Sequence, residues 1–332
     1  MKINKYSLNN GLRLVHYQDL STQMVALNII YDVGARDEHP EHTGFAHLFE
    51  HLMFGGSVNI PDYDAPLQSA GGENNAWTNN DITNYYLTVP KSNVEIGFWL
   101  ESDRMLELAF SEQSLEVQRG VVMEEFKQRC LNQPYGDVGH LFRPLAFRVH
   151  PYRWPTIGKE LSHIEQATLD EVKSFFYRFY APNNAVLAVT GNISWDETVK
   201  LTEKWFAPIP RRDVPVRQLP QEPEQTQERR LTVERNVPLD ALFMGYHMCS
   251  REGADYYAFD ILSDILSNGR SSRLNRRLVQ EQNIFSGIDA YISGTRDAGL
   301  LQISGKPAAG VSLEQAEAAV RKELEEFIRR FS

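Results

Sequence analysis

Two histidines and one glutamate within five residues form the first segment of the chain whose residue types and spacing suit catalysis. The segment HLFEH occupies residues 47–51. Residues four apart lie on one face of an α-helix, so His47 and His51 can direct two imidazoles at one metal ion. Glu50 would lie beside the ion, where a carboxylate can accept a proton from a metal-bound water.

Zinc is the metal that this donor set favours. It accepts imidazole and carboxylate ligands in a tetrahedral site, leaves one position for water and lowers the pKa of that water to about 7. The order HxxEH is the reverse of HExxH, an order that binds zinc in many peptidases. The five residues therefore predict hydrolytic chemistry at one zinc ion. The alternative is a solvated helix face that carries two histidines and a glutamate without a metal.

A third protein ligand is needed for such a site, and an acidic helical segment further along the chain offers candidates. It reads Glu116-Val-Gln-Arg-Gly-Val-Val-Met-Glu124-Glu125. Spacing alone leaves the choice among its glutamates open.

The surrounding sequence predicts the elements that would position these residues. An apolar strand over 25–33 precedes a helix that begins near Thr43 and Gly44, runs over 45–54 and ends at Gly55-Gly56. Further helices are predicted over 63–70, within 91–130 (two helices), over 195–206 and over 312–330, and further strands over 12–15, 75–78, 83–89, 183–191 and 241–248.

Composition and an internal repeat indicate two domains. Five prolines between 208 and 223 lie among Gln, Glu and Arg, which is typical of a linker. We therefore predict domains over 1–212 and 229–332, joined by a linker over 213–228. The segment Phe259–Ser271 repeats the pattern of Phe45–Ser57 without a gap, but Ile261, Asp264 and Ile265 replace the two histidines and the glutamate. The second domain is thus expected to be a metal-free and incomplete repeat, truncated at its C-terminus.

Several motifs together resemble the pitrilysin-like zinc peptidases, which include the insulin-degrading enzyme and the mitochondrial processing peptidase. The resemblance covers nearly the whole chain and rests on HLFEH, on GGENNAWT (71–78) with DITNYY (81–86), on RGVVMEE (119–125), on HPY (150–152) and on FYAPNN (179–184). It implies an α+β fold of two homologous units, each an antiparallel-rich sheet covered by helices. It also implies a zinc endopeptidase that hydrolyses extended peptides or unfolded polypeptides.

The resemblance also assigns residues to roles. The distal zinc ligand of the family lies six residues after an arginine, which corresponds to Glu125. The family binds its substrate as an added strand along an edge strand, here the strand with Asn75 and Ala76, although Asn75 also suits a plain turn or strand end. Many members carry a second glutamate seven residues before the distal ligand, where this chain has Gln118, and Glu116 on the adjacent turn is the candidate substitute.

The second domain departs from the family pattern. Single-chain members carry an arginine and, seven residues later, a tyrosine that stabilises the transition state, where this chain has Val279 and Ser286. We therefore expect a partner subunit, as in heterodimeric members, or a second copy of this chain to supply the missing groups. The alternative to an enzyme is a noncatalytic scaffold or assembly subunit of the same fold, although such homologues typically lose motif residues that remain here.

Charge and composition limit the other function classes. The net charge of −10 argues against binding to nucleic acid or anionic lipid, which needs clustered Lys and Arg. Cys130 and Cys249 are too few for a disulfide framework. No apolar run is long enough to span a bilayer, and the N-terminus lacks the features of a signal peptide. We expect a cytoplasmic protein, or a periplasmic one if a leader was removed before Met1.

Overall fold

The computed structural model of the chain describes residues 2–331, with side chains described through residue 329. The chain divides into two compact units, Met1–Thr226 and Gln227–Ser332. The division lies inside the segment 213–228 that the sequence predicts as a linker. Each unit has its own hydrophobic core.

A six-stranded sheet forms the centre of the first unit, with the strand order β1-β2-β6-β3-β5-β4. Among the described strands of this sheet, only β2 and β6 pair in parallel. Alternate residues of β3 are buried, which is the pattern of a strand with one face in the core. The strands are β1 (Asn4–Ser7), β2 (Arg13–Gln18), β3 (Met24–Tyr31), β4 (Glu73–Thr78), β5 (Thr83–Pro90) and β6 (Ala185–Gly191).

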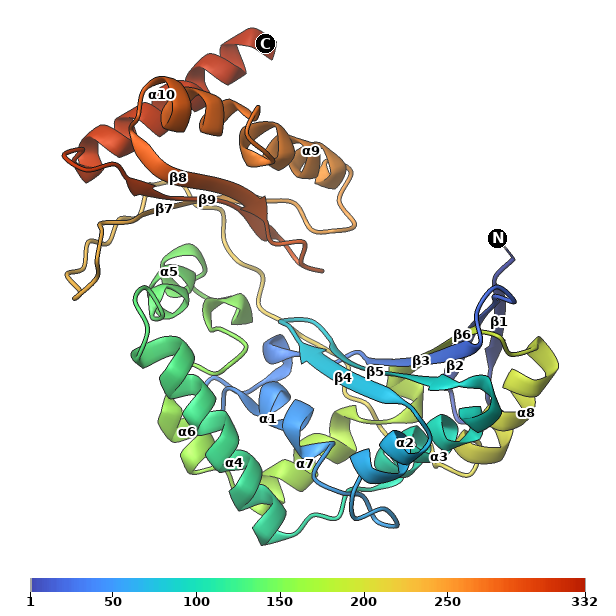
Figure 1. Cartoon of the computed structure of the whole chain (residues 1–332). Helices are drawn as coiled ribbons and strands as arrows, with labels where there is room; N and C mark the ends of the chain where they lie inside the picture. Colours follow the sequence, from blue (N-terminus) through green and yellow to red (C-terminus); the bar gives the residue numbers. More distant parts are fainter. Residues whose placement is uncertain (1, 332) are drawn as a thin grey trace. The chain divides into compact units, whose positions relative to one another are not determined.

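Helices of the first unit cover one face of this sheet, where α1, α3 and α7 lie (Figure 1). Aromatic rings from β3, β5, α1 and α7, together with Tyr180 directly after α7, meet there and form much of the core. The helices are α1 (Phe45–Leu52), α2 (Asp64–Ser69), α3 (Val94–Leu106), α4 (Glu112–Phe126), α5 (Val138–Ala146), α6 (Leu161–Glu165), α7 (Leu169–Phe179) and α8 (Trp195–Phe206).

The second unit repeats part of this plan. It contains β7 (Leu242–Met248), α9 (Tyr256–Ser267), a π-helical segment Asn275–Glu281, β8 (Phe285–Ile292), β9 (Gly299–Pro307) and α10 (Leu313–Phe331). Helices α9 and α10 lie on the same face of its three-stranded sheet (Figure 1). Its strand order, β7-β9-β8, matches the order β3-β5-β4 of the first unit. In both units a strand and then a helix precede an antiparallel hairpin. The second strand of the hairpin also pairs with the strand that lies before the helix.

Most elements expected from the sequence are present with boundaries shifted by a few residues. The helix predicted over 45–54 ends at Leu52, and Gly56 then adopts a left-handed backbone conformation with φ of 99°. The α+β class with two homologous units is confirmed. Helices α5, α6 and α7 and strands β1, β8 and β9 were not anticipated.

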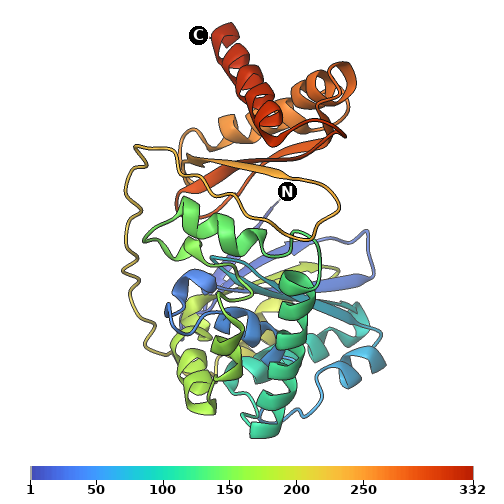
Figure 2. The ribbon, with the colours of Figure 1, turned by 90° about the vertical axis from the view of Figure 1, so that its left-hand side faces the viewer.

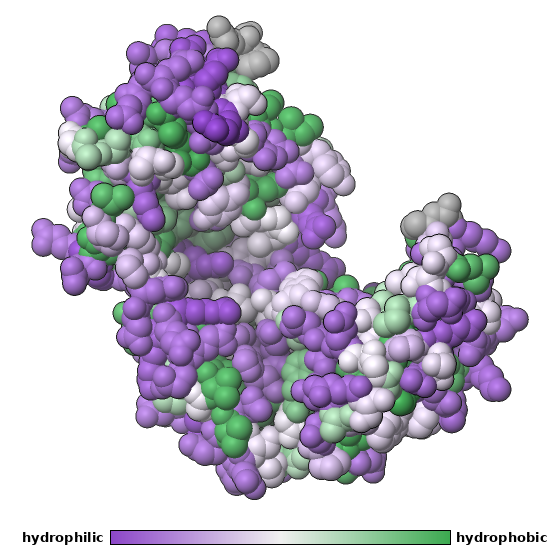
Figure 3. Space-filling model, in the orientation of Figure 1, coloured by the Kyte–Doolittle hydropathy of each residue, from purple (hydrophilic) through white to green (hydrophobic). Residues whose placement is uncertain are grey.

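Polar and charged side chains predominate on the face of the molecule that Figure 3 presents, and apolar residues appear there in small groups. Within residues 2–331, no helix combines the length and the apolarity that a membrane span requires.

The segment after α8 follows the first unit as extended chain without regular structure (Figure 2). It is bound to that unit at three places. Arg212 donates to the carbonyl oxygens of Tyr180 and Leu106, at 2.8 and 2.7 Å. Arg217 pairs with Asp32 and Asp37. The Glu222 carboxylate accepts hydrogen bonds from three consecutive backbone amides, those of residues 148–150. The first part of the predicted linker is therefore anchored.

Candidate metal centre

Helix α1 presents His47, Glu50 and His51 on the face opposite to its apolar side. Phe45, Leu48, Phe49 and Leu52 are buried and recur at the three- and four-residue spacing of an amphipathic helix. The ring of Phe49 stacks on two rings of α7 and on Tyr180 directly after it, and Tyr85 of β5 donates to the Phe49 carbonyl oxygen at 3.1 Å. These contacts fix the rotation of α1, because only one orientation buries this aromatic side.

Helix α4 brings Glu125 to the two histidines of α1. Glu125 Oε2 lies 3.5 Å from His47 Nε2 and 3.4 Å from His51 Nε2. The candidate ligand atoms of the three residues all lie within 4.8 Å of one another. The neighbouring Glu124 is exposed and pairs with Lys127 at 2.6 Å instead. The structure therefore directs Glu125, and not Glu124, towards His47 and His51.

The donor set and its spacing fit a zinc ion. Bonds of about 2.0–2.2 Å and tetrahedral angles place neighbouring ligand atoms about 3.4 Å apart, close to the two nitrogen–oxygen distances. Burial lowers the pKa of His47 to about 4, so this imidazole is neutral at ordinary pH, as metal binding requires. Among the residues that the structure describes, no second group of this kind is present.

Glu50 lies beside this cluster and is half-buried. Burial raises the pKa of its carboxyl group above the usual range, while the nearby Thr78 hydroxyl of β4 and His51 oppose the rise. A carboxylate with a raised pKa is a stronger base, so the environment of Glu50 suits proton transfer.

The other residues singled out in the sequence lie at varying places around the cluster. Asn75 and Ala76 lie in β4, which is an edge strand of the six-stranded sheet, and the Asn75 side chain is exposed. Gln118 lies two helical turns before Glu125 and so on the same face of α4. The structure does not bring Glu116 to the site, because its side chain is 72% exposed and pairs with Arg119 at 2.6 Å.

In the second unit, the counterparts of the ligand residues are solvent-facing. Ile261 and Ile265 of α9 are 60% and 45% exposed, and Asp264 is exposed as well. Val279 packs half-buried against the core of that unit, and the exposed Ser286 hydroxyl donates to the Lys306 carbonyl oxygen at 3.1 Å. The two positions where the family has Arg and Tyr therefore hold small side chains without charge.

Two contributors to the site were not recognised from the sequence. Arg129 belongs to a π-helical segment, Lys127–Leu131, that continues α4, and it pairs with Glu125 Oε1 at 2.9 Å. Its position four residues after Glu125 is the pattern that could have revealed it. Glu38 accepts hydrogen bonds from the first turn of α1. The glycine at the start of that helix was the available indication, since Gly44 cannot cap it with a side chain.

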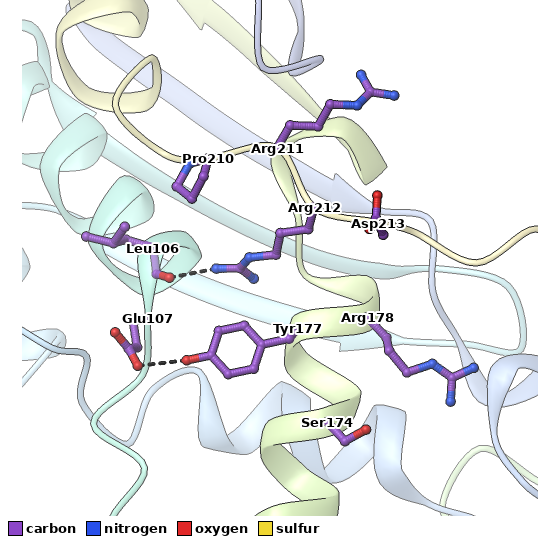
Figure 4. A pocket seen from close by; sticks show the side chains of 9 residues that line it. All are labelled: Leu106, Glu107, Ser174, Tyr177, Arg178, Pro210, Arg211, Arg212 and Asp213. Carbon is purple, nitrogen blue, oxygen red and sulfur yellow. Dashed lines mark hydrogen bonds between the residues drawn. The ribbon is translucent and has the colours of Figure 1, made fainter.

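A cavity of about 700 Å³ lies elsewhere in the first unit and includes no residue of the cluster. Figure 4 shows the nine residues that line it, with hydrogen bonds from Arg212 to Leu106 and from Tyr177 to Glu107. The guanidinium group of Arg212 donates to three carbonyl oxygens around this cavity. Arg212 therefore attaches the linker to the unit, and we assign this cavity no part in the chemistry.

Comparison with known proteins gives the same class as the fold and the cluster. The family model described as "Insulinase (Peptidase family M16)" matches residues 13–138, and the model described as "Peptidase M16 inactive domain" matches residues 166–332. The chain therefore belongs to peptidase family M16. His47, Glu50, His51 and Glu125 all lie in the first match, and the inactive-domain match contains none of them.

Relatives and solved structures extend this likeness over most of the chain. The "Zinc protease PqqE" of Helicobacter pylori is 31% identical over 291 residues, which is 86% of this chain and 65% of the relative. The "Uncharacterized zinc protease YmxG" of Bacillus subtilis is 25% identical over 97% of this chain and 78% of the relative. The crystal structure of a protease from Helicobacter pylori aligns with a TM-score of 0.90 and 28% identity over 99% of this chain and 79% of that chain.

Pitrilysin shows the same fold at 20% identity with a TM-score of 0.71, over 92% of this chain and 34% of that chain. About two thirds of that chain therefore lie outside the alignment. The relatives that are named proteases support a protease of this fold.

Proposed function

We propose that the chain is a zinc-dependent endopeptidase that cleaves extended peptides or unfolded polypeptides. The observation that carries the proposal is the placement of His47, His51 and Glu125 at the spacing of zinc ligands, with Glu50 beside them. Zinc bound there would lower the pKa of a coordinated water to about 7 and polarise the carbonyl group of the scissile bond.

The residues of the chain supply the remaining steps. Glu50 accepts the proton of the attacking water and returns it to the leaving amine, as its position and its raised pKa favour. The edge strand β4 binds the substrate as an added strand through main-chain hydrogen bonds, with Asn75 and Ala76 beside the peptide. An extended peptide on β4 lies near α1, since Thr78 of the same strand adjoins Glu50.

Glu50→Gln tests the proposal. The variant should bind one zinc ion per chain as the wild type does, and it should cleave a quenched peptide library about 10²–10⁴-fold more slowly, the usual contribution of a general base. Glu124→Gln, which changes an exposed carboxylate next to Glu125, is the control and should leave both quantities unchanged. Equal cleavage by the wild type and Glu50→Gln would refute the mechanism. Zinc-free wild type without peptidase activity would favour the noncatalytic scaffold.

We further propose that a partner subunit or a second copy of the chain completes the site. Val279 and Ser286 cannot supply the charge and the hydroxyl-bearing ring that the family places there. The purified chain alone should therefore cleave peptides weakly. Full activity of the isolated chain as a monomer would contradict this part of the proposal.

A further inference from the structure

The first turn of α1 is capped by a side chain from outside the helix. Gly44 occupies the cap position with φ of 89° and has no side chain to accept the free amides of the first turn. Glu38 accepts them: Oε2 from the Gly44 amide and Oε1 from the Ala46 amide, both at 2.9 Å. The Glu38 residue is only 6% exposed, so water cannot easily replace it.

This cap adjoins the first candidate ligand. Ala46, whose amide Glu38 accepts, directly precedes His47 in the same helical turn. A displacement of this turn would change the separation of 3.5 Å between His47 Nε2 and Glu125 Oε2. Metal sites depend on ligand positions within about 0.2 Å. The position of the Glu38 carboxylate therefore bears directly on the geometry of the cluster.

Glu38 is itself held through its neighbour Asp37. Residues Ala35–Asp37 form a short 3₁₀ helix, and Glu38 follows it. The Asp37 side chain is 1% exposed and accepts hydrogen bonds from Arg217 and, at 3.0 Å, from the Gly34 amide. Arg217 also pairs with Asp32 at 3.0 Å.

Arg217 comes from the linker. The charge that neutralises the buried Asp37 thus lies 180 residues further along the chain, in the segment that leads to the second unit. A buried carboxylate needs such a partner, because an unpaired charge in the interior is strongly unfavourable. Without Arg217, Asp37 would either move towards solvent or take up a proton, and in both cases the turn that carries Glu38 would shift.

We propose that Glu38 is a positioning residue of the metal centre, and that Arg217 of the linker keeps it in place through Asp37. The inference rests on the proposed function, because it requires that the cluster of His47, His51 and Glu125 binds zinc. It adds that the affinity for zinc depends on a contact between the linker and the first unit. Separation of this part of the linker from the unit weakens metal binding.

Zinc affinity of the full chain, measured by competition with a chromophoric chelator, tests the proposal. Glu38→Gln keeps the shape of the side chain but replaces one acceptor oxygen with an amide donor that faces a backbone N–H. It should weaken zinc binding about 10–100-fold, as changes to groups that orient metal ligands typically do. Arg217→Met should weaken it less, and Arg217→Lys should restore part of the loss. Glu228→Gln, which alters a linker carboxylate paired with Arg321 in the second unit, should have no effect.

A variant that combines Glu38→Gln with Arg217→Met tests whether Arg217 acts through Glu38. Because Arg217 acts through Glu38, the variant with both changes should bind zinc as Glu38→Gln alone does. Additive losses would overturn the role of Arg217. The visible spectrum of the Co²⁺-substituted protein, which reports the arrangement of ligands, should change in Glu38→Gln and Arg217→Met but not in Glu228→Gln.

The outcomes separate this inference from the proposed function. Unchanged zinc affinity and Co²⁺ spectrum in a folded Glu38→Gln variant would overturn the inference while the peptidase proposal stands. If Glu38→Gln does not fold, the same two measurements are made on Arg217→Met. An unchanged zinc affinity and an unchanged Co²⁺ spectrum in that variant would also overturn the inference. A wild type that binds no zinc would overturn the proposed function and the inference together.

Discussion

Two adjacent glutamates on α4 provide a sharp test of the metal centre. Glu125 and Glu124 have the same side chain, but only the Glu125 carboxylate points towards the histidines of α1. Among the side chains that the structure describes, Glu125→Ala removes the only carboxylate within 3.5 Å of both His47 Nε2 and His51 Nε2. Glu124→Ala removes an exposed carboxylate whose partner is Lys127. Alanine is the best helix former, so neither change should disturb α4.

The structure sets a lower limit for the effect. Changes to groups that merely orient metal ligands cost about 10–100-fold in affinity, and we propose Glu125 as a direct ligand. Its loss should therefore weaken zinc binding more than about 100-fold, which corresponds to about 2.8 kcal/mol. Glu124→Ala should change the dissociation constant less than about twofold.

Competition with a chromophoric chelator measures both constants, and circular dichroism of the metal-free proteins controls for folding. Peptide cleavage should fall with zinc occupancy in Glu125→Ala and stay at the wild-type rate in Glu124→Ala. Equal zinc constants for the two variants would refute the assignment of Glu125, and a larger loss in Glu124→Ala would reverse it.

Further predictions concern the metal, the capping carboxylate, the core and the sheet edge. Chelation should abolish peptide cleavage, and one equivalent of Zn²⁺ should restore it; activity that persists without metal contradicts the mechanism. Burial raises the pKa of Glu38 above its ordinary value of 4.5, although the two α1 amides favour the ionised form, so the folded metal-free protein binds this proton more tightly than the unfolded chain does. Its free energy of unfolding should therefore fall as the pH rises above about 4.5, and urea titrations should show a flatter profile for Glu38→Gln. Arg104→Met leaves the buried Glu101 unpaired and should cost about 3–5 kcal/mol in urea unfolding, whereas Lys127→Met at an exposed pair should cost under about 1 kcal/mol. Peptides N-methylated at alternate residues should be cleaved more slowly than their parents, since they cannot pair with β4; equal rates would argue against strand addition.

The sequence predicted those parts of the molecule that depend on local pattern. The HLFEH helix, the strand before it and the hairpin after it follow from apolar periodicity and glycine positions, which act over a few residues. The repeat at Phe259–Ser271 was recognised in the same way, and the matching strand orders of the two sheets support it.

Features that depend on distant segments could not be predicted. The parallel pairing of β2 with β6 joins residues near 13 to residues near 186, and no local pattern indicates it. The pairs between Arg217 and Asp37 and between Glu38 and the α1 amides arise only when the chain is folded. Helical geometry, in contrast, could already have separated Gln118 from Glu116, because nine residues along a helix lead to the opposite face.

The equal strand orders of the two sheets show which parts of the unit do not depend on the candidate ligands. The second unit builds a core from Leu266, Leu278, Phe285 and their neighbours, although isoleucines stand where the first unit has histidines. The core of this unit is apolar, and within the described residues it carries no group of candidate metal ligands. The same order of strands and helix thus accommodates either set of residues at these helix positions, so the architecture of a unit and the chemistry of its helix are separable.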